Sequence, residues 1–196
     1  MKKILIGTHN RGKFKEISDL LSKKVKKISP ITLKIKSPKE TGKTFKENSE
    51  IKAKYFCKKS KIISISDDSG LCVDSLNGKP GIYSARWGKR YGGFHNAMKK
   101  IISLVKKKSS RHKTSKAKFV CSLTLMYPNG KKLTSIGQIN GSISNKILGK
   151  NGFGYDAIFI PKGKKLTFGQ MNKKKKYLID HRYKAFKKLK RKIKTL

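Results

Sequence analysis

The chain has 196 residues, with 51 lysines and arginines against 10 aspartates and glutamates and a formal net charge of +41. This length suits one domain, or two lobes that share a core, so we expect residues 1–196 to form a single domain with two lobes. No apolar run approaches the roughly 20 residues of a membrane-spanning helix, and the few apolar residues before Thr8 are too short for a signal peptide. We therefore expect a cytoplasmic protein with no membrane partner.

The basic charge invites a nucleic-acid interpretation. However, only six of the 51 basic residues are arginine, and the lysines are spread along the whole chain. Proteins that read nucleic acid favour arginine forks and aromatic platforms. We therefore expect non-specific binding to polyanions at low salt, but no specific nucleic-acid partner.

Three cysteines, Cys57, Cys72 and Cys121, are an odd number without the spacing of a metal site. Each lies among apolar neighbours, which favours buried free thiols in a reducing compartment. We do not expect a zinc site.

The chain begins with a predicted strand, Lys3–Ile6, a loop over residues 7–13, and a helix whose apolar face starts at Phe14. A strand, a glycine-containing loop and a helix start can bind phosphate through backbone N–H groups, although the GxxxxGK[ST] pattern is absent. The candidate phosphate-binding residues of this loop are Thr8, His9, Asn10, Arg11, Gly12 and Lys13.

A second helix is predicted from Phe45, because Thr44 and Glu47 form a capping box after a polar, irregular or edge segment, 30–39. We expect its core face to carry Phe45, Ile51, Tyr55 and Phe56. Glu40, just before the cap, is either a metal ligand or a residue that simply caps the helix or is solvated. Lys52, one turn into the helix, either reaches a phosphate or is one more surface lysine.

Asp67 and Asp68 are the most conspicuous acidic residues, because they follow the β-branched run 62–66, which reads as a buried strand. In an α/β sheet, ligands collect beyond the carboxyl ends of strands. Two carboxylates there can hold Mg²⁺, and one can take a proton from water. The alternative is a turn, since Asp-Ser-Gly is ordinary turn chemistry.

The middle of the chain alternates between predicted helix and strand. A turn at 77–81 precedes an amphipathic helix around 98–105, and the polar run 106–116 is predicted to be a solvated linker or loop. Strands are predicted at 118–126 and 133–140, joined by a hairpin turn at 128–130.

Gly152–Asp156 is a second glycine-rich loop, followed by a predicted strand at 157–161. Its aromatic residues can offer flat faces to a base, or one of them can tuck inward from a tight turn. The closing helix begins near His181 and Arg182, which can read the edge of a base or be random basic residues on a surface helix.

Together these segments resemble the inosine triphosphatase family, the XTP/dITP diphosphatases that remove deaminated purine nucleotides. The resemblance covers nearly the whole chain and keeps five motifs in order. The motifs start at Thr8, Glu40, Asp67, Gly152 and Lys176, and the last includes His181-Arg182.

The resemblance implies an α/β fold with a long mixed sheet, flanking helices and two lobes around a central substrate groove. It implies Mg²⁺-dependent hydrolysis of a purine nucleoside triphosphate to the monophosphate and pyrophosphate, and typically a homodimer. It makes Asp68 the general base and a metal ligand, with Glu40 and Asp67 as further metal ligands. The residues that it assigns to the substrate are Thr8, Asn10, Lys13, Lys52, Ser69, Phe153, Gly154, Tyr155, Asp156, Lys176, His181 and Arg182.

Two positions depart from the family pattern. Asp180 replaces the family's serine before His181-Arg182 and could pair with Arg182, which bears on the choice of base. Ala157 replaces a proline, which loosens the backbone after the loop. Two alternatives stay open: a basic nucleic-acid-binding protein without catalysis, and a related pyrophosphatase for modified pyrimidine nucleotides.

Overall fold

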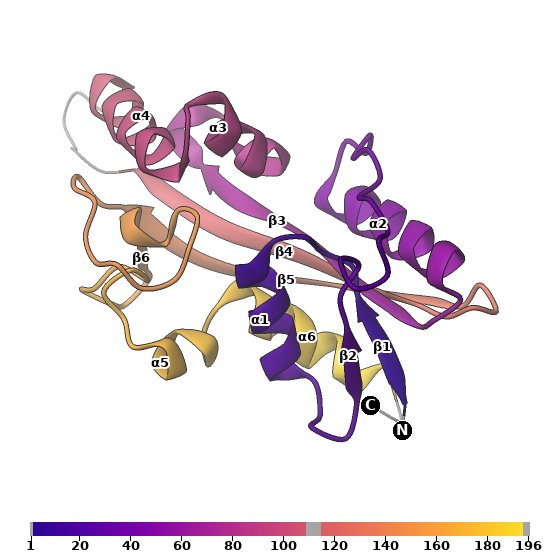
Figure 1. Cartoon of the computed structure of the whole chain (residues 1–196). Helices are drawn as coiled ribbons and strands as arrows, with labels where there is room; N and C mark the ends of the chain where they lie inside the picture. Colours follow the sequence, from indigo (N-terminus) through magenta and orange to yellow (C-terminus); the bar gives the residue numbers. More distant parts are fainter. Residues whose placement is uncertain (1, 109–114, 194–196) are drawn as a thin grey trace. The chain divides into compact units, whose positions relative to one another are not determined.

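The structure is a computed structural model that describes residues 2–108 and 115–193. Within these described residues, six strands form one mixed sheet in the order β2-β1-β3-β4-β5-β6 (Figure 1). β1 pairs in parallel with both β2 and β3, whereas β5 and β6 are antiparallel. The strands are β1 (Lys3–Ile6), β2 (Lys26–Ile28), β3 (Ser64–Val73), β4 (Lys116–Met126), β5 (Lys132–Ile143) and β6 (Phe159–Pro161).

Helices flank the sheet, so the predicted α/β class is confirmed. Within the described part of the chain, no helix is long and apolar enough to cross a bilayer. The α-helices are α1 (Arg11–Leu20), α2 (Phe45–Ser60), α3 (Ser84–Arg90), α4 (Phe94–Lys108), α5 (Lys173–Tyr177) and α6 (His181–Arg191). Residues 2–108 and 115–193 also contain three short 3₁₀ helices, η1 (Asp74–Leu76), η2 (Gly81–Tyr83) and η3 (Asp156–Ile158).

The chain divides into two compact units. Unit 1 contains residues 1–68, 121–137 and 182–196, and unit 2 contains residues 69–120 and 138–181. In unit 1, apolar residues of β1, α1, β4 and α6 form one core. In unit 2, residues of β3, α4 and β5 and the segment 155–171 form another, which holds Phe119, Phe159 and Phe168.

Helix α2 does not bury the face that its aromatic residues predict. Of the four expected core residues only Phe56 is fully buried. The buried face instead carries Asn48, Ser49 and Lys52 near the start of the helix. Ser49 Oγ lies 2.9 Å from Ser122 Oγ and 2.8 Å from Thr124 Oγ1 of β4, so hydroxyl groups rather than apolar contacts join this end of α2 to the sheet.

Other sequence predictions need correction at their boundaries. The two aspartates lie inside β3 rather than after its end, because the strand continues to Val73. The 62–66 run therefore marked only the start of a longer strand. Helix α1 begins at Arg11, which places Lys13 in its first turn rather than in the preceding loop. Of the polar run 106–116, residues 109–114 lie outside the described residues, while Lys106 to Lys108 continue α4.

Candidate active site

The parallel pairing of β1 with β3 brings the loop after β1 to the acidic strand. Leu5 lies opposite Ser64 and Ile6 opposite Ile65, and the Gly7 amide donates to the Ile65 carbonyl at 2.8 Å. A Cβ on Gly7 would lie only 2.2 Å from Ser66 Oγ. The absence of a side chain at Gly7 thus allows the loop to start against β3, immediately before the two aspartates.

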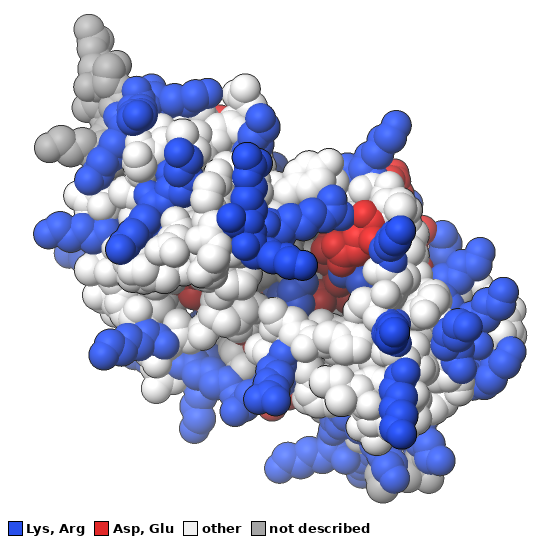
Figure 2. All heavy atoms as spheres, turned by 45° about the horizontal axis from the view of Figure 1, so that its top comes forward, with Lys and Arg blue, Asp and Glu red and all other residues white. Residues whose placement is uncertain are grey.

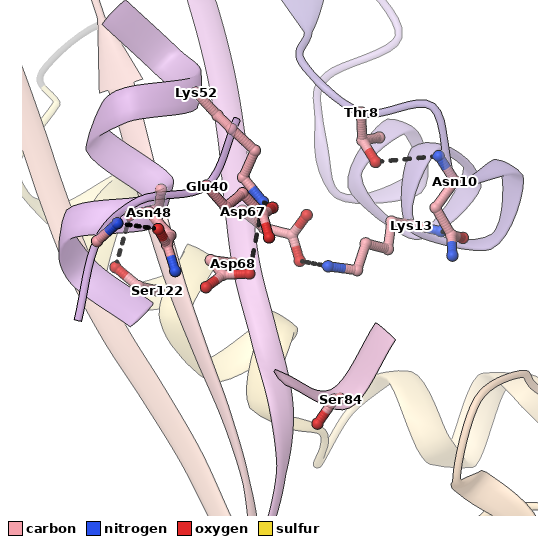
Figure 3. Close-up of polar contacts among 12 residues, drawn as sticks. Thr8, Asn10, Lys13, Glu40, Asn48, Lys52, Asp67, Asp68, Ser84 and Ser122 are labelled. Carbon is pink, nitrogen blue, oxygen red and sulfur yellow. Dashed lines mark hydrogen bonds and ion pairs between the residues drawn. The ribbon is translucent and has the colours of Figure 1, made fainter. Parts of the chain in front are cut away.

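The loop passes directly into the N-terminus of α1. Asn10 caps the helix by accepting a 3.0 Å hydrogen bond from the Lys13 amide, and the Asn10 amide donates to Thr8 Oγ1. His9 Nδ1 lies 2.6 Å from Ser37 Oγ. The cap fixes the first turn, and Lys13 Nζ lies 3.1 Å from Asp67 Oδ2 (Figure 3).

Asp67 is held from a second side by the start of α6. Arg182 donates to Asp67 Oδ2 at 3.2 Å and also to Glu16 Oε2 of α1. All three side chains are buried. A buried carboxylate needs such charged partners to stay ionised. This network therefore makes Asp67 a fixed negative charge next to Asp68.

Asp68 and Glu40 share one cation, Lys52. Lys52 Nζ lies 2.5 Å from Glu40 Oε1 and 3.4 Å from Asp68 Oδ1 (Figure 3). Asp68 Oδ2 is buried and accepts no hydrogen bond from the residues that the structure describes. Asp68 thus has one oxygen engaged by an ammonium group and one buried oxygen still able to accept a proton.

The surroundings of Asp68 raise its pKa above the usual carboxyl value. Burial is the largest cause, and the negative charges of Glu40 and Asp67 add to it, against the opposing effect of Lys52 and Lys13. For Lys52, burial lowers the pKa, but Asp68, Asp67 and Glu40 outweigh it and the pKa is raised. Lys52 therefore stays protonated beside a carboxylate whose basicity is increased.

The ion-paired side chains around β3 carry a net negative charge, which favours binding of a further cation. Among the described residues, no three His, Cys, Asp or Glu side chains are already arranged to bind a metal ion. The side chains of the ion pairs around Asp67 and Asp68 nevertheless carry four negative and three positive formal charges. The whole chain, by contrast, carries +41. The paired side chains are Glu16, Glu40, Asp67 and Asp68, and Lys13, Lys52 and Arg182. Carboxylate oxygens in a locally negative site fit Mg²⁺, the hard cation that the sequence predicts.

Elsewhere the basic side chains are not gathered in one place. Figure 2 shows lysine and arginine atoms scattered over this face of the molecule, while acidic atoms gather mainly in one patch. The scatter is that of a generally basic surface rather than a basic stripe following one helix or groove.

Unit 2 contains the predicted glycine-rich aromatic loop. Asp156 Oδ2 accepts from the Phe153 amide at 2.9 Å and from Lys176 Nζ at 2.6 Å, and both charged side chains are buried. Gly152 has φ +76°, and a Cβ there would lie 2.0 Å from Asp156 Oδ2. Lys176 Nζ also lies 5.3 Å from the centre of the half-buried Phe153 ring. The loop conformation is thus fixed by one carboxylate.

Two further predicted residues of unit 2 are packed into its core. Tyr155 donates to the Ser84 carbonyl at 2.9 Å and meets Phe94 edge to face. Burial raises the pKa of Tyr155. The His181 ring stacks on Phe119, with centroids 4.8 Å apart. Of the two aromatic residues in the loop, Tyr155 is therefore the one that tucks inward.

The structure brings the predicted residues together in two sets. In unit 1, ion pairs join Lys13 to Asp67 and Lys52 to both Glu40 and Asp68, and Thr8 and Asn10 lie at the start of α1. In unit 2 they join Phe153, Asp156 and Lys176. Ser69 begins unit 2, where Gly154, Tyr155 and His181 also lie, whereas Arg182 belongs to unit 1 with Arg11 and Gly12.

Sequence reasoning missed two polar residues at this site. Glu16 binds Arg182 although it is 166 residues away in sequence. Asn48, on α2, accepts a 2.8 Å hydrogen bond from the Gly42 amide and is fully buried. Glu16 ends the motif that starts at Thr8, and Asn48 stands in the motif that starts at Glu40, but neither was given a role. The position of Asn48 offered a signal, because a polar residue four positions before Lys52 shares its helix face.

Known proteins share this arrangement of elements. The model of the Ham1 family matches residues 4–192. A dITP/XTP pyrophosphatase of Rhodospirillum centenum is 38% identical over 187 residues, covering 95% of this chain and 92% of that protein. A dITP/XTP pyrophosphatase of Bacillus subtilis is 38% identical over 192 residues, covering 96% of each chain.

Solved structures agree with the sequence comparison. A HAM1 protein from Coxiella burnetii is similar with a TM-score of 0.85 and 31% identity over 96% of each chain. A dITP/XTP pyrophosphatase from Mycobacterium abscessus has a TM-score of 0.74 and 33% identity, covering 95% of this chain and 98% of that one. The predicted family resemblance is confirmed, and this chain belongs to the Ham1 family.

Proposed function

We propose that this chain hydrolyses deaminated purine nucleoside triphosphates (dITP, ITP and XTP) to the nucleoside monophosphate and pyrophosphate. Relatives that are 38% identical over nearly the whole chain are dITP/XTP pyrophosphatases. The observation that carries the proposal is the buried Asp68 and the partly exposed Glu40 on either side of Lys52, with one oxygen of Asp68 able to accept a proton.

Asp68 serves as the general base for the attacking water. Water adds to the α-phosphorus as the anhydride bond between the α- and β-phosphates breaks and pyrophosphate leaves. The proton released by the water goes to Asp68 Oδ2. Lys52 holds Oδ1 and keeps the carboxylate ionised and oriented. The raised pKa of Asp68 increases its capacity to take that proton. The base is thus positioned by its own ion pair.

Asp68, Glu40 and Asp67 are the residues that would hold Mg²⁺, because they are the carboxylates of the locally negative part of unit 1, paired with Lys52 and Lys13. The ion supplies charge neutralisation for the phosphates when it is bound. Lys13 and Lys52 supply positive charge as well, and Asn10 and Thr8 order the helix start at which backbone N–H groups can meet a phosphate. Ser69, His9, Arg11 and Gly12 complete this proposed phosphate-binding set.

The aromatic loop of unit 2 is proposed to bind the nucleoside. Phe153 is half-buried, which leaves part of its ring able to stack on a purine, while Asp156 and Lys176 fix the loop. Gly154 has φ +66° and lets the backbone turn between the two aromatic residues. Tyr155 supports the loop from inside the core.

His181 and Arg182 are proposed to read the 6-keto oxygen of the purine. A site that donates to this oxygen loses hydrogen bonds when it meets the amino group of adenine, and so rejects it. In this structure Arg182 also donates to Glu16 and Asp67, so it supports the catalytic strand as well. Asp180 is buried beside this pair, and its effect on selectivity stays a prediction.

The homodimer, the cytoplasmic location and the substrate groove stay predictions of the sequence. The two alternative functions predict different behaviour of the same protein. Nucleic-acid binding without catalysis gives no role to Asp68, and a pyrimidine-specific enzyme gives none to a donor pair for a 6-keto purine.

The test measures pyrophosphate release from dITP, XTP, dATP and dGTP with Mg²⁺, for wild type and Asp68→Asn. We expect release from dITP and XTP, little from the other two, and loss in the variant. Equal release from all four would contradict the base-reading role of His181 and Arg182. No release by the folded wild-type protein would contradict the proposed function.

A further inference from the structure

The side chain of Asn48 contains a buried amide nitrogen for which the described residues provide no hydrogen-bond acceptor. Its side chain is 0% exposed, and Nδ2 has no hydrogen-bond partner among the described residues. Leaving a buried amide donor unpaired is energetically unfavourable. Its other end is satisfied, because Oδ1 accepts from the Gly42 amide at 2.8 Å. That hydrogen bond also fixes which end of the amide is oxygen, and so which end faces away from Gly42.

The unpaired nitrogen belongs to the face of α2 that meets Asp68. Asn48 lies four residues before Lys52, hence on the same face of the helix, and Lys52 Nζ lies 3.4 Å from Asp68 Oδ1. In Figure 3 the side chains of Asn48, Lys52 and Asp68 converge, and the amide nitrogen of Asn48 is directed toward Asp68. Asp68 Oδ2 is likewise buried without a hydrogen-bond partner in the described chain.

A buried donor without an acceptor and a buried acceptor without a donor thus lie on the same side of the site. Because no direct hydrogen bond joins them, a small polar molecule with both functions is what would satisfy the two. Water is such a molecule. It accepts from an amide nitrogen and donates to a carboxylate.

We propose that Asn48 is a positioning residue that holds the attacking water against Asp68 Oδ2. This inference rests on the proposed function, since it names the partner of the base in the same reaction. Nδ2 donates to a lone pair of the water oxygen and leaves one water proton directed at Asp68. The second lone pair of that oxygen is then free to attack phosphorus.

The loop that carries Glu40 supports the same orientation. The 2.8 Å hydrogen bond from Gly42 restrains the Asn48 amide, and Glu40, two residues earlier, binds Lys52. A Cβ on Gly42 would lie 2.8 Å from Asn48 Oδ1 and 2.6 Å from the Cβ of Glu47, so loop and amide are in close contact. One amide therefore links the loop of Glu40 to the base.

A purely structural role of Asn48 can be separated from a positioning role by Asn48→Asp. Aspartate has the same shape and keeps an oxygen for the Gly42 amide, but it replaces the donor directed at Asp68 by an acceptor. The matched control is Asn129→Asp, the same chemical change on the exposed turn between β4 and β5, where Oδ1 accepts from the Lys131 amide. Asn48→Leu removes both the hydrogen bond from the Gly42 amide and the proposed one to the water.

Steady-state kinetics with dITP and Mg²⁺ should show a kcat lowered about 10- to 100-fold in Asn48→Asp, with KM within about twofold of wild type. Asn129→Asp should match wild type, and Asn48→Leu should lose both kcat and thermal stability. A kcat of Asn48→Asp within about twofold of wild type would overturn the positioning role. An inactive wild-type protein would instead refute the proposed function.

A crystal structure of the nucleotide-free wild-type protein decides the matter even where the variants fail to fold. We expect one ordered water within about 3.2 Å of both Asn48 Nδ2 and Asp68 Oδ2. A direct hydrogen bond between the two side chains, or no water between them, would overturn the proposal.

Discussion

The acidic site of unit 1 and the aromatic loop of unit 2 each bury a carboxylate beside a lysine, but they use it differently. In unit 2, Asp156 Oδ2 accepts hydrogen bonds from both the Phe153 amide and Lys176 Nζ, and these two bonds fix the conformation of the loop. In unit 1, Asp68 binds Lys52 with one oxygen and keeps the other without a hydrogen bond in the described chain. A satisfied carboxylate stabilises structure, and an unsatisfied one is available for chemistry.

The surroundings of the two carboxylates follow this division. Asp68 lies among Glu40, Asp67 and their cations, and its raised pKa reflects burial and like charge. Asp156 lies in a loop whose lysine also faces the rings of Phe153 and Phe168. We therefore expect changes in unit 1 to lower the rate of the chemical step, and changes in the loop of unit 2 to weaken nucleotide binding.

The largest effect should come from Lys52→Met, which leaves Glu40 and Asp68 without their shared cation. Breaking a buried ion pair costs about 3–5 kcal/mol, and the partial exposure of the Glu40 side chain favours the lower end. Thermal or urea unfolding should show this loss, and Mg²⁺ should stabilise the variant more than it stabilises wild type. Lys54→Met, on the exposed side of the same helix, is the control and should change little. Equal stability of both variants would contradict a structural role for the Lys52 pairs.

Gly152→Ala should act on binding rather than on chemistry. Its Cβ would lie 2.0 Å from Asp156 Oδ2, which displaces the carboxylate that holds Phe153 and Lys176. We expect KM for dITP to rise about tenfold with kcat within about threefold. Gly163→Ala is the matched control, because Gly163 has the same φ of +76° but, apart from its chain neighbours, no atom of the described residues would lie within 4 Å of the added Cβ. The control should lose about 1 kcal/mol of stability from backbone strain and keep its KM. A similar rise in KM in both variants would show that strain alone is responsible.

Tyr155 is expected to have a smaller effect, on the free energy of unfolding at alkaline pH. Above pH 10, the usual tyrosine value, the unfolded chain loses the phenol proton while folded Tyr155 keeps it, because burial raises its pKa. The free energy of unfolding therefore falls as pH rises, by about 1.4 kcal/mol per pH unit from this group. Tyr155→Phe should remove that part of the fall, at a constant cost of about 1 kcal/mol for the lost hydrogen bond to Ser84.

Urea unfolding between pH 9 and 11 measures this difference in slope. Tyr83→Phe, at a 48% exposed tyrosine, should follow wild type throughout. Parallel curves for wild type and Tyr155→Phe would contradict the raised pKa.

Much of the fold followed from the sequence because its signals are local. The capping box predicted the start of α2 at Phe45, and alternation located β4 and β5 within a few residues. Short elements such as β2 and α5 were missed, because three or five residues carry too little pattern. The extent of β3 was missed because Asp67, Asp68 and Gly70 disfavour strand, and only pairing in the sheet overrides that preference.

The sequence predicted residues of the candidate site, but not the contacts between them. The motifs identified Glu40, Lys52 and Asp68, yet nothing local showed that Lys52 joins the two carboxylates. Ion pairs such as that of Glu16 with Arg182 link residues far apart in sequence, so only the folded structure reveals them. The buried polar face of α2 was likewise hidden, because its aromatic residues suggested a different core face.

The most direct test of the division between the two regions compares Asp68→Asn with Gly152→Ala at rising dITP concentrations, with Mg²⁺ present. We expect saturating dITP to restore most of the wild-type rate in Gly152→Ala. Asp68→Asn should stay about 10²- to 10⁴-fold slower at saturation, because the base itself is lost. Recovery of Asp68→Asn at saturation, or a Gly152→Ala rate that stays low there, would contradict the account.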